Sequence, residues 1–289
     1  MRYVTRPPGP PLRPFIEHFW ALNDEPSHGR ERVVPSGTIE LVVNLARDEL
    51  RIFDAEGNPA ACRRFRGALI SGCYGQSFGI DTRDHTAIVG VHFRPGGAAR
   101  LLGVPPGELM DLHVALADVW GERAVELRER SCAARNASER FELLEQALGE
   151  RLPDSPPAAS AIATALRELD RPGVAVSDVA RRLQLSRRRF IEIFTRDVGM
   201  TPKRYARVRR FQHALSLASS SPSPAWARLA LECGYYDQAH LCREWAELTG
   251  LSPSRWAAQR ATTVKENHVA LPPRGSHSSN TPRPEAVRL

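Results

Sequence analysis

The sequence has no run of 18 or more apolar residues, so it lacks a segment long enough to cross a membrane as a helix. Its first residues, MRYVTRPPGPPLRPF, lack the apolar core of a secretory signal. These absences argue against a membrane or exported protein. We therefore expect a chain that works in the cytoplasm.

Cysteine is sparse, and no two cysteines form a CxxC pair; the five stand at positions 62, 73, 132, 233 and 242. Such a scattered, odd-numbered set argues against a disulfide framework and against a zinc knuckle. His85, His92 and His113 lack the HxH spacing of metal-dependent cupin-like enzymes. We therefore expect reduced thiols, no metal and no cofactor.

Acidic residues are scarce in one part of the chain. Residues 160–260 contain 17 of the 40 Lys and Arg residues but only 9 of the 33 Asp and Glu residues, a net charge of +8. The rest of the chain has a net charge of −1. A basic region beside a nearly neutral one is the electrostatic pattern of a nucleic-acid binder.

One stretch occurs twice, as SRRRFIEIFTRDVGMTPKRY at residues 186–205 and as DQAHLCREWAELTGLSPSRW at residues 237–256. Each copy begins with a helix-capping residue and has a large apolar residue four positions on and an aromatic residue eight positions on. Each then shows Gly, an apolar residue, Ser or Thr, Pro, and an aromatic residue three positions after the Pro. The repeat predicts two equivalent modules in one domain.

Each copy predicts a helix, a sharp stop and a second helix. Ser186 and Asp237 can accept hydrogen bonds from the free N–H groups of a helix start. Gly199 and Gly250 suit the left-handed residue that ends a helix, and the Thr-Pro or Ser-Pro pair that follows suits a new start. A shorter amphipathic helix, with Ser177 as its expected cap in the first copy, precedes each repeat after a tight turn. This is the helix-turn-helix pattern, whose second helix lies in a DNA major groove.

Residues from about 160 to 258 resemble the DNA-binding domain of the AraC/XylS family of bacterial transcription regulators. In the first half the resemblance rests on Ala180, Leu183, Ser186, Phe190, Phe194, Gly199, Thr201-Pro202 and Tyr205. In the second half it rests on Ala230, Gly234-Tyr235, Asp237-Gln238, Leu241, Arg243, Gly250 and Ser252-Pro253. Trp245 departs from the family, which usually has Phe there. The resemblance implies a sequence-specific transcription regulator that reads two successive major grooves with helices 187–198 and 238–249.

The resemblance also places Arg188, Ile191 and Glu192 of the first such helix against the bases. Arg188 suits guanine O6 and N7, Glu192 suits cytosine N4, and Ile191 suits a thymine methyl group. Arg187 and Arg196 lie on the same face, with phosphate contact or plain solvation as the alternative for Arg187. For Glu192 an ion pair within the helix, with Arg188 or Arg196 four positions away, is equally open.

On the second helix the groove face comprises Gln238, Ala239, His240, Cys242 and Arg243. Arg243 is the expected base contact, Gln238 could contact an adenine or a phosphate, and His240 could contact a phosphate. A zinc site at His240 and Cys242 would lack further ligands. The remaining arginines of this region are expected to contact phosphates or solvent; they are Arg204, Arg207, Arg209, Arg210 and Arg255.

Residues 1–115 are predicted to form a β-rich α+β domain, either a cupin-like barrel or a sandwich. Short strands separated by Gly and Pro turns are expected at 32–34, 38–45, 50–53, 65–70, 76–81 and 86–93. A short strand or helix is expected at 14–21, and helices are expected at 95–103 and 108–120. The stretches VVPSGTIELVVNL and GVHFRPGGAARLLG resemble the N-terminal domain of a subset of AraC-type proteins. This likeness implies a role in sensing a small molecule or in dimerisation. Glu40, His92 and Arg94 are the candidate ligand-binding residues, with ordinary core-edge pairs as the alternative.

Residues 116–157 are predicted to form two helices that pack on the N-terminal domain, followed by a linker at 154–157. Residues 158–260 are then the all-α domain with two helix-turn-helix motifs, in which a helix at 203–218 joins the modules. Residues 261–289 are polar and rich in Pro and Ser, which predicts a disordered tail.

An enzyme is the alternative function, because some proteins join this DNA-binding module to DNA-repair alkyl transfer through a reactive cysteine. Such an alkyltransferase would carry a four-cysteine zinc cluster or a PCHR motif, and the sequence has neither. We therefore expect no catalytic residue. The expected partner is double-stranded DNA, with a small-molecule effector, RNA polymerase and a second copy of the chain as further candidates, and no membrane.

Overall fold

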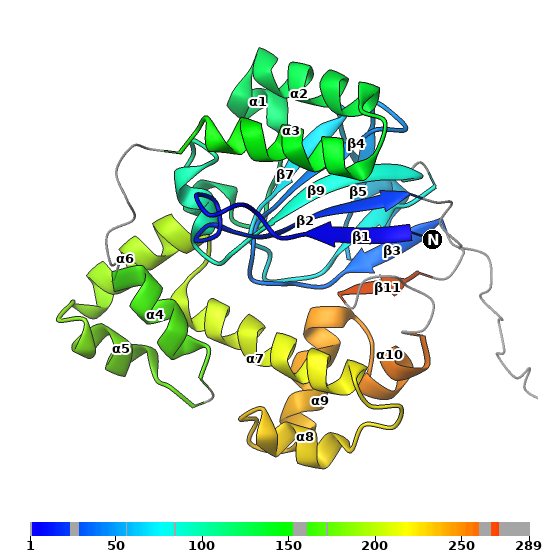
Figure 1. Ribbon diagram of the computed structural model, residues 1–289. Coiled ribbons are helices and arrows are strands. Elements are labelled where there is room, and N and C mark those ends of the chain that lie inside the picture. The colour runs from blue at the N-terminus through cyan, green and yellow to red at the C-terminus, as the bar shows by residue number, and fades with distance from the viewer. Residues whose placement is uncertain are drawn as a thin grey trace, which may run out of the picture.

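The computed structural model describes residues 2–23, 29–55, 57–83, 85–152, 161–171, 173–259 and 267–271. A two-sheet domain from the N-terminal half lies against an all-helical domain from the C-terminal half (Figure 1). The predicted architecture, a β-rich N-terminal domain followed by an all-α domain, is therefore confirmed. None of the helices within these ranges is long and apolar enough to cross a membrane.

Two antiparallel sheets form the N-terminal domain. The six-stranded sheet has the order β1-β2-β9-β4-β7-β10, with β1 (Arg2–Arg6), β2 (Ile16–Asn23), β4 (Glu40–Asn44), β7 (Ala68–Ser71), β9 (Ala87–Phe93) and β10 (His113–Ala115). The five-stranded sheet has the order β11-β3-β8-β5-β6, with β3 (Arg30–Val33), β5 (Leu50–Phe53), β6 (Arg63–Phe65), β8 (Phe78–Asp81) and β11 (His268–Ala270). Because side chains alternate along a strand, each sheet presents one face to the space between them.

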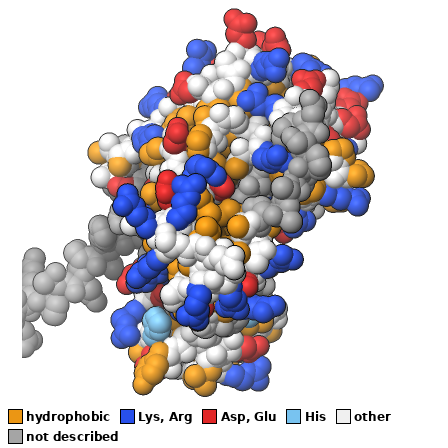
Figure 2. Space-filling model, turned by 90° about the vertical axis from the view of Figure 1, so that its left-hand side faces the viewer, with side chains coloured by type: hydrophobic (Ala, Val, Ile, Leu, Met, Phe, Trp, Pro, Cys, Tyr) orange, Lys and Arg blue, Asp and Glu red, His pale blue; other side chains and the backbone are white. Residues whose placement is uncertain are grey.

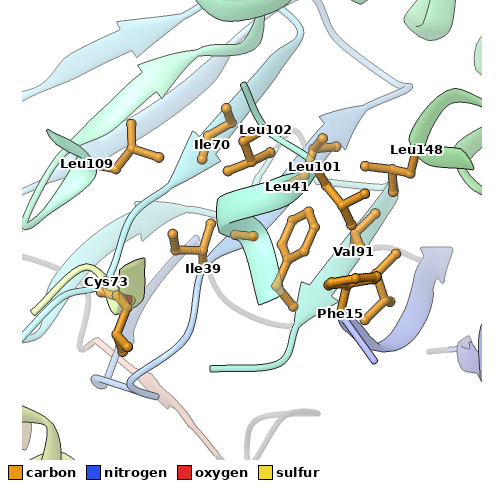
Figure 3. Close-up of a cluster of buried hydrophobic side chains, with 14 of the residues drawn as sticks. Phe15, Ile39, Leu41, Ile70, Cys73, Val91, Leu101, Leu102, Leu109 and Leu148 are labelled. Atoms are coloured by element: carbon orange, nitrogen blue, oxygen red, sulfur yellow. The ribbon is translucent and has the colours of Figure 1, made fainter. Parts of the chain in front are cut away.

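Three helices cover the other face of the six-stranded sheet, namely α1 (Leu116–Trp120), α2 (Glu122–Ala133) and α3 (Ala137–Gly149) (Figure 1). Phe141 of α3 packs on Phe19 of β2, with ring centroids 6.1 Å apart. Figure 3 shows strand residues such as Leu41 and Val91 near Leu148 of α3 in one cluster. Helices α2 and α3 are the two predicted for residues 116–157.

The helical domain comprises α4 (Ala161–Leu169), α5 (Val176–Arg182), α6 (Arg187–Val198), α7 (Pro202–Ser219), α8 (Trp226–Glu232), α9 (Gln238–Thr249) and α10 (Pro253–Gln259). We call α5 with α6 the first module and α8 with α9 the second module. Trp245 is the centre of the second module, with its ring 5.2 Å from Phe211, 5.3 Å from Trp226 and 5.1 Å from Trp256. The indole of Trp245, which is larger than a phenyl ring, is packed among these three rings.

Three strands lie where none was expected. β1 forms in the proline-dense start and pairs with β2, and β10 replaces part of a predicted helix and pairs with β7. β11 lies in the segment predicted to be disordered, where it pairs with β3 and Val269 is fully buried. The tail prediction is therefore wrong for residues 267–271, because that prediction weighed only local composition. The rest of the tail and the linker at 154–157 lie outside the described residues.

Candidate nucleic-acid interface

Helix α6 is bounded as its sequence predicts. The Ser186 hydroxyl accepts the N–H of Arg189 at 3.2 Å, an N-cap bond that contributes about 1 kcal/mol. Gly199 ends the helix with φ at 93°, and a Cβ there would lie 3.1 Å from both the Cys73 Sγ and the Pro106 carbonyl oxygen. Glycine is therefore required here both by the backbone and by the close approach of the N-terminal domain.

The start of α5 differs from the prediction. Ala175, not Ser177, is the cap residue of this helix, and its side chain makes no cap hydrogen bond. Val176, the first residue of the helix, packs against the hydrophobic core, so burial of this side chain fixes the start two residues early. The prediction that Ser177 caps α5 is wrong for this reason.

The two faces of α6 differ in character. Its buried face consists of Phe190, Phe194 and Val198, and its exposed face includes Arg187, Arg188 and Glu192, with Ile191 half-buried between them. An ion pair joins Glu192 Oε1 to Arg189 Nη1 at 3.1 Å. Glu192 therefore forms an ion pair within the helix, but with Arg189 and not with Arg188 or Arg196. Both partners are exposed, so the pair is weak.

Arg196, the last predicted contact on α6, lies at the edge of this face. Its guanidinium pairs with Asp197, with an Nε to Oδ1 distance of 2.6 Å. Its backbone lies against Gly107 of η3 (Pro106–Leu109), where a Cβ would be 3.1 Å from the Arg196 Cα. Arg196 thus borders the N-terminal domain, whereas Arg187 and Arg188 lie at the free end of the helix.

Helix α9 repeats this arrangement in the second module. Asp237 caps it by accepting the His240 N–H at 2.7 Å, and Gly250 ends it with φ at 70°. Its exposed face carries Gln238, Ala239 and Arg243, with His240 and Cys242 half-buried. The His240 ring meets Tyr235 edge-on at 5.2 Å and its Nδ1 accepts the Tyr236 N–H at 3.4 Å, so its orientation is set by the turn.

Helix α7 joins the two modules through ion pairs. Its 18 residues span about 27 Å at ~1.5 Å per residue. The buried carboxylate of Glu244 on α9 accepts from Arg207 Nε at 3.0 Å and from Arg210 Nη2 at 2.7 Å. Arg207 also pairs with Glu247. These bonds fix α9 to the connecting helix and so set the orientation of the second module.

The four arginines of α7 that were predicted to contact phosphates or solvent form ion pairs within the protein. In addition to Arg207 and Arg210, Arg209 pairs with Asp170 at 2.9 Å, and Arg204 forms two hydrogen bonds with Asp111 at 2.5 and 2.8 Å. Carboxylates from distant parts of the chain thus hold all four side chains, which also line the groove described below, and their contact with phosphates stays a prediction. Arg255 lies on α10 and is exposed.

A groove of about 920 Å³ lies between the two modules along α7. Both Arg187, at the start of α6, and His240, in the first turn of α9, line it together with Lys203 and Arg171. Figure 2 shows Lys and Arg side chains over both halves of one face, including the lower half where the helical domain lies. The first turns of both helices therefore open onto one basic groove.

Both modules contact the N-terminal domain. The Cys73 thiol donates to the Val198 carbonyl at the end of α6 at 3.0 Å. In the second module, Val34 and Val269 from the five-stranded sheet side belong to the same core as Trp245 and Trp256. Arg32 Nη1 donates to the Thr249 carbonyl at the end of α9 at 2.7 Å. The N-terminal domain thus contacts the C-terminal ends of α6 and α9 and leaves their first turns free.

The candidate ligand residues are only partly together. His92 Nδ1 lies 2.9 Å from Glu40 Oε1, and Glu40 lines a cavity between the two sheets. Arg94 lies beyond the end of β9 and donates to the Arg13 carbonyl at 3.0 Å, so it is directed elsewhere. The cavity residues that the sequence did not indicate come from strands far apart in the chain; among them are Glu31, His113 and His268. Within the described ranges, no group of three or more His, Cys, Asp or Glu residues could hold a metal ion.

Comparison with family models gives two matches. One, described as a helix-turn-helix domain, covers residues 179–259, and the other, described as a domain of unknown function (DUF6597), covers residues 4–115. An uncharacterized helix-turn-helix-type transcriptional regulator of Haemophilus influenzae is 36% identical over 81 residues, which span 28% of this chain and 27% of that protein. The predicted helix-turn-helix domain is confirmed for this part of the chain.

Among solved structures, ToxT of Vibrio cholerae aligns over 88% of this chain and 99% of its own, with 10% identity and a TM-score of 0.46. The DNA-binding domain of AdpA, in complex with a target DNA, aligns over 37% of this chain and 96% of its own, with 29% identity and a TM-score of 0.32. An AraC-type regulator structure from Chromobacterium violaceum aligns over 35% of this chain and 88% of its own, with 24% identity and a TM-score of 0.31.

Proposed function

We propose that this chain, whose residues 179–259 form an AraC-type helix-turn-helix domain, is a sequence-specific DNA-binding transcription regulator that works in the cytoplasm. Helices α6 and α9 enter two successive major grooves on one face of the duplex. The N-terminal domain modulates this binding through a small molecule. RNA polymerase and a second copy of the chain are further partners that such a regulator would use.

The observation that carries the proposal is that two equally capped helices with exposed polar faces begin at one basic groove, which Arg187 and His240 of their first turns line. A connecting helix of about 27 Å, with the width of the flanking helices added, suits two reading helices one DNA turn, ~34 Å, apart. The ion pairs of Glu244 support this spacing, because they hold α9 against the connecting helix. A fixed distance between α6 and α9 favours binding to two adjacent major grooves over binding to two separate sites.

For the first helix, the exposed side chains of Arg188 and Glu192 support base contacts, with Ile191 beside them and Arg187 positioned for a phosphate. When DNA is bound, Glu192 must exchange Arg189 for a base donor, an exchange between exposed groups that costs little. Arg196 is exposed as well, but it borders the N-terminal domain. It suits the backbone at the edge of the groove.

For the second helix, Arg243 and Gln238 are exposed and support base contacts, while Ala239 allows close approach of the helix. His240 is held by the turn and suits a phosphate oxygen. Cys242 is half-buried and contributes to the packing of the helix. The arginines proposed to read bases thus lie on α6 and α9, whereas those that form ion pairs within the domain lie on α7.

We propose no enzymatic step. Alkyl transfer of the kind considered above needs a thiolate nucleophile. Burial raises the pKa of the Cys73 thiol to about 12 and that of Cys233 to about 11, so both stay protonated at neutral pH.

The proposal is tested by measuring how single arginine variants change base preference in the full chain. Arg188→Ala and Arg243→Ala should each relax the preference at particular base pairs by about 1–3 kcal/mol and leave other positions unchanged. Arg66→Ala removes the same charge from a side chain that is 92% exposed in the other domain and serves as the matched control. If Arg188→Ala and Arg243→Ala weaken binding to every sequence equally, these residues do not read bases.

A further inference from the structure

A cavity of about 100 Å³ lies between the two sheets of the N-terminal domain. Aliphatic and aromatic side chains form most of its wall, including Leu50, Ile52, Leu69, Phe78 and Trp20. A well-formed apolar cavity with a few convergent polar groups is the usual form of a small-molecule site. Its volume suits a molecule of a few carbon atoms, since an apolar cavity of ~150 Å³ holds benzene.

The charges in the wall restrict what this cavity can hold. Two carboxylates face it, Glu31 from β3 and Glu40 from β4, and no Lys or Arg is among the described residues that line it. His113, also in the wall, is kept neutral because burial lowers its pKa from 6.5 to about 3. An anionic ligand would meet like charge in a medium of low dielectric, whereas a cation would meet an opposite charge.

The two carboxylates differ in how they are held. Glu40 bonds to His92, which lies on β9 in the middle of the six-stranded sheet. Glu31 is 6% exposed and bonds to Nδ1 of His268, which lies on β11, a three-residue strand at the edge of the five-stranded sheet. As an edge strand, β11 pairs with β3 on one side, so it is displaced more easily than β9, which lies between β2 and β4. The His268 imidazole is therefore the partner that an incoming cation can replace.

The other faces of β3 and β11 contact the DNA-binding domain. Arg32 follows Glu31 and points away from the cavity, to the Thr249 carbonyl at the end of α9. Val269 follows His268 and lies in the core of the second module. Strand alternation thus places the cavity and the second module on opposite faces of the same two strands. A change at the Glu31–His268 pair is transmitted to α9 across a single strand.

We propose that the cavity binds a small, mostly apolar primary amine whose ammonium group takes the Glu31 carboxylate from His268, and that this exchange loosens β11 from the second module. The regulatory part of this inference rests on the function proposed above, while the binding part does not. The apolar body of the amine lies between the sheets. Release of Val269 removes part of the packing that supports the second module and so changes the affinity of this module for DNA.

Calorimetry on the full chain tests the ligand class with matched compounds of one carbon skeleton. The probes are 3-methylbutylamine, 3-methylbutanol and 3-methylbutanoate, with the isobutyl and benzyl series for smaller and larger bodies. In at least one series we expect the amine to bind at least tenfold more tightly than the alcohol and the carboxylate not to bind. Equal affinity for amine and alcohol, preference for the carboxylate, or no binding of any amine overturns the proposal.

Two variants test the role of the carboxylate. Glu31→Gln keeps the shape and removes the charge, so it should lose the tenfold preference for the amine. Glu142→Gln, whose side chain is 66% exposed on α3, should keep it. The comparison of amine with alcohol in the unaltered chain does not depend on how either variant folds.

Hydrogen exchange tests the movement of β11. The Leu271 N–H donates to the Arg30 carbonyl at 3.0 Å, and its exchange should become at least fivefold faster when the amine is bound. Unchanged exchange with the amine bound would overturn the release of the strand. Because these measurements contain no DNA, amine selectivity without any preferred duplex would refute only the function proposed above, and a preferred duplex without amine selectivity would refute only the cavity proposal.

Discussion

Val269 offers a direct measure of how strongly the C-terminal strand holds the second module. Its side chain is fully buried in the core that contains Trp245 and Trp256. Val269→Ala removes two methyl groups, each worth about 0.8 kcal/mol of transfer free energy, and leaves a small cavity beside them. The strand pairing with β3 stays intact, so the change isolates the side chain. We expect the free energy of unfolding to fall by about 2–3 kcal/mol.

Urea denaturation of the full chain, followed by tryptophan fluorescence, measures this loss, since Trp245 and Trp256 report on the second module. Val125→Ala is the matched control, because it makes the same chemical change at a side chain that is 52% exposed on α2. The control should stay within about 0.5 kcal/mol of the unaltered protein. A loss of less than about 0.5 kcal/mol for Val269→Ala would show that the strand is not seated in this core.

Three further outcomes follow from the packing and the pKa shifts. Gly199→Ala should destabilise the chain by more than about 1 kcal/mol in the same assay, because φ is 93° and the new Cβ meets Cys73 and Pro106; a neutral result would contradict the contact. Cys73, whose pKa burial raises to about 12, should not react with a thiol reagent at pH 8 in the folded chain, whereas exposed Cys132 should; fast labelling of Cys73 would show that the domains separate. Because burial lowers the pKa of His113 from 6.5 to about 3, the unfolded chain binds the proton first, so stability should fall as pH drops from about 6.5 toward 3, and less steeply in His113→Gln; equal slopes would contradict this.

Local chemistry explains why the helical domain was predictable from sequence. The caps Ser186 and Asp237 and the stops Gly199 and Gly250 act within one turn of themselves, so their pattern determines the helix ends directly. The apolar stripe of each helix likewise fixes which face is buried. The prediction that Ser177 caps α5 was wrong because the packing of the neighbouring side chain, Val176, determines where that helix begins.

Long-range partners explain what the sequence did not reveal. Arg204 looked like a phosphate ligand, but its partner Asp111 lies 93 residues away along the chain. Val269 looked like part of a polar tail, although β3 and the second module bury it. The candidate ligand residue Glu40 does face the cavity, yet Glu31 and His268 come together there from opposite ends of the chain. No local pattern encodes such pairs.

Selection of bound duplexes from a random pool by the full chain, at near-physiological salt, tests the central claim most directly. Two helices in successive major grooves on one face predict two short conserved blocks about ten base pairs apart. A single block would mean that one module reads bases and the other holds only the backbone. No enrichment, with binding that fades as salt rises, would show non-specific phosphate binding and contradict the proposed function.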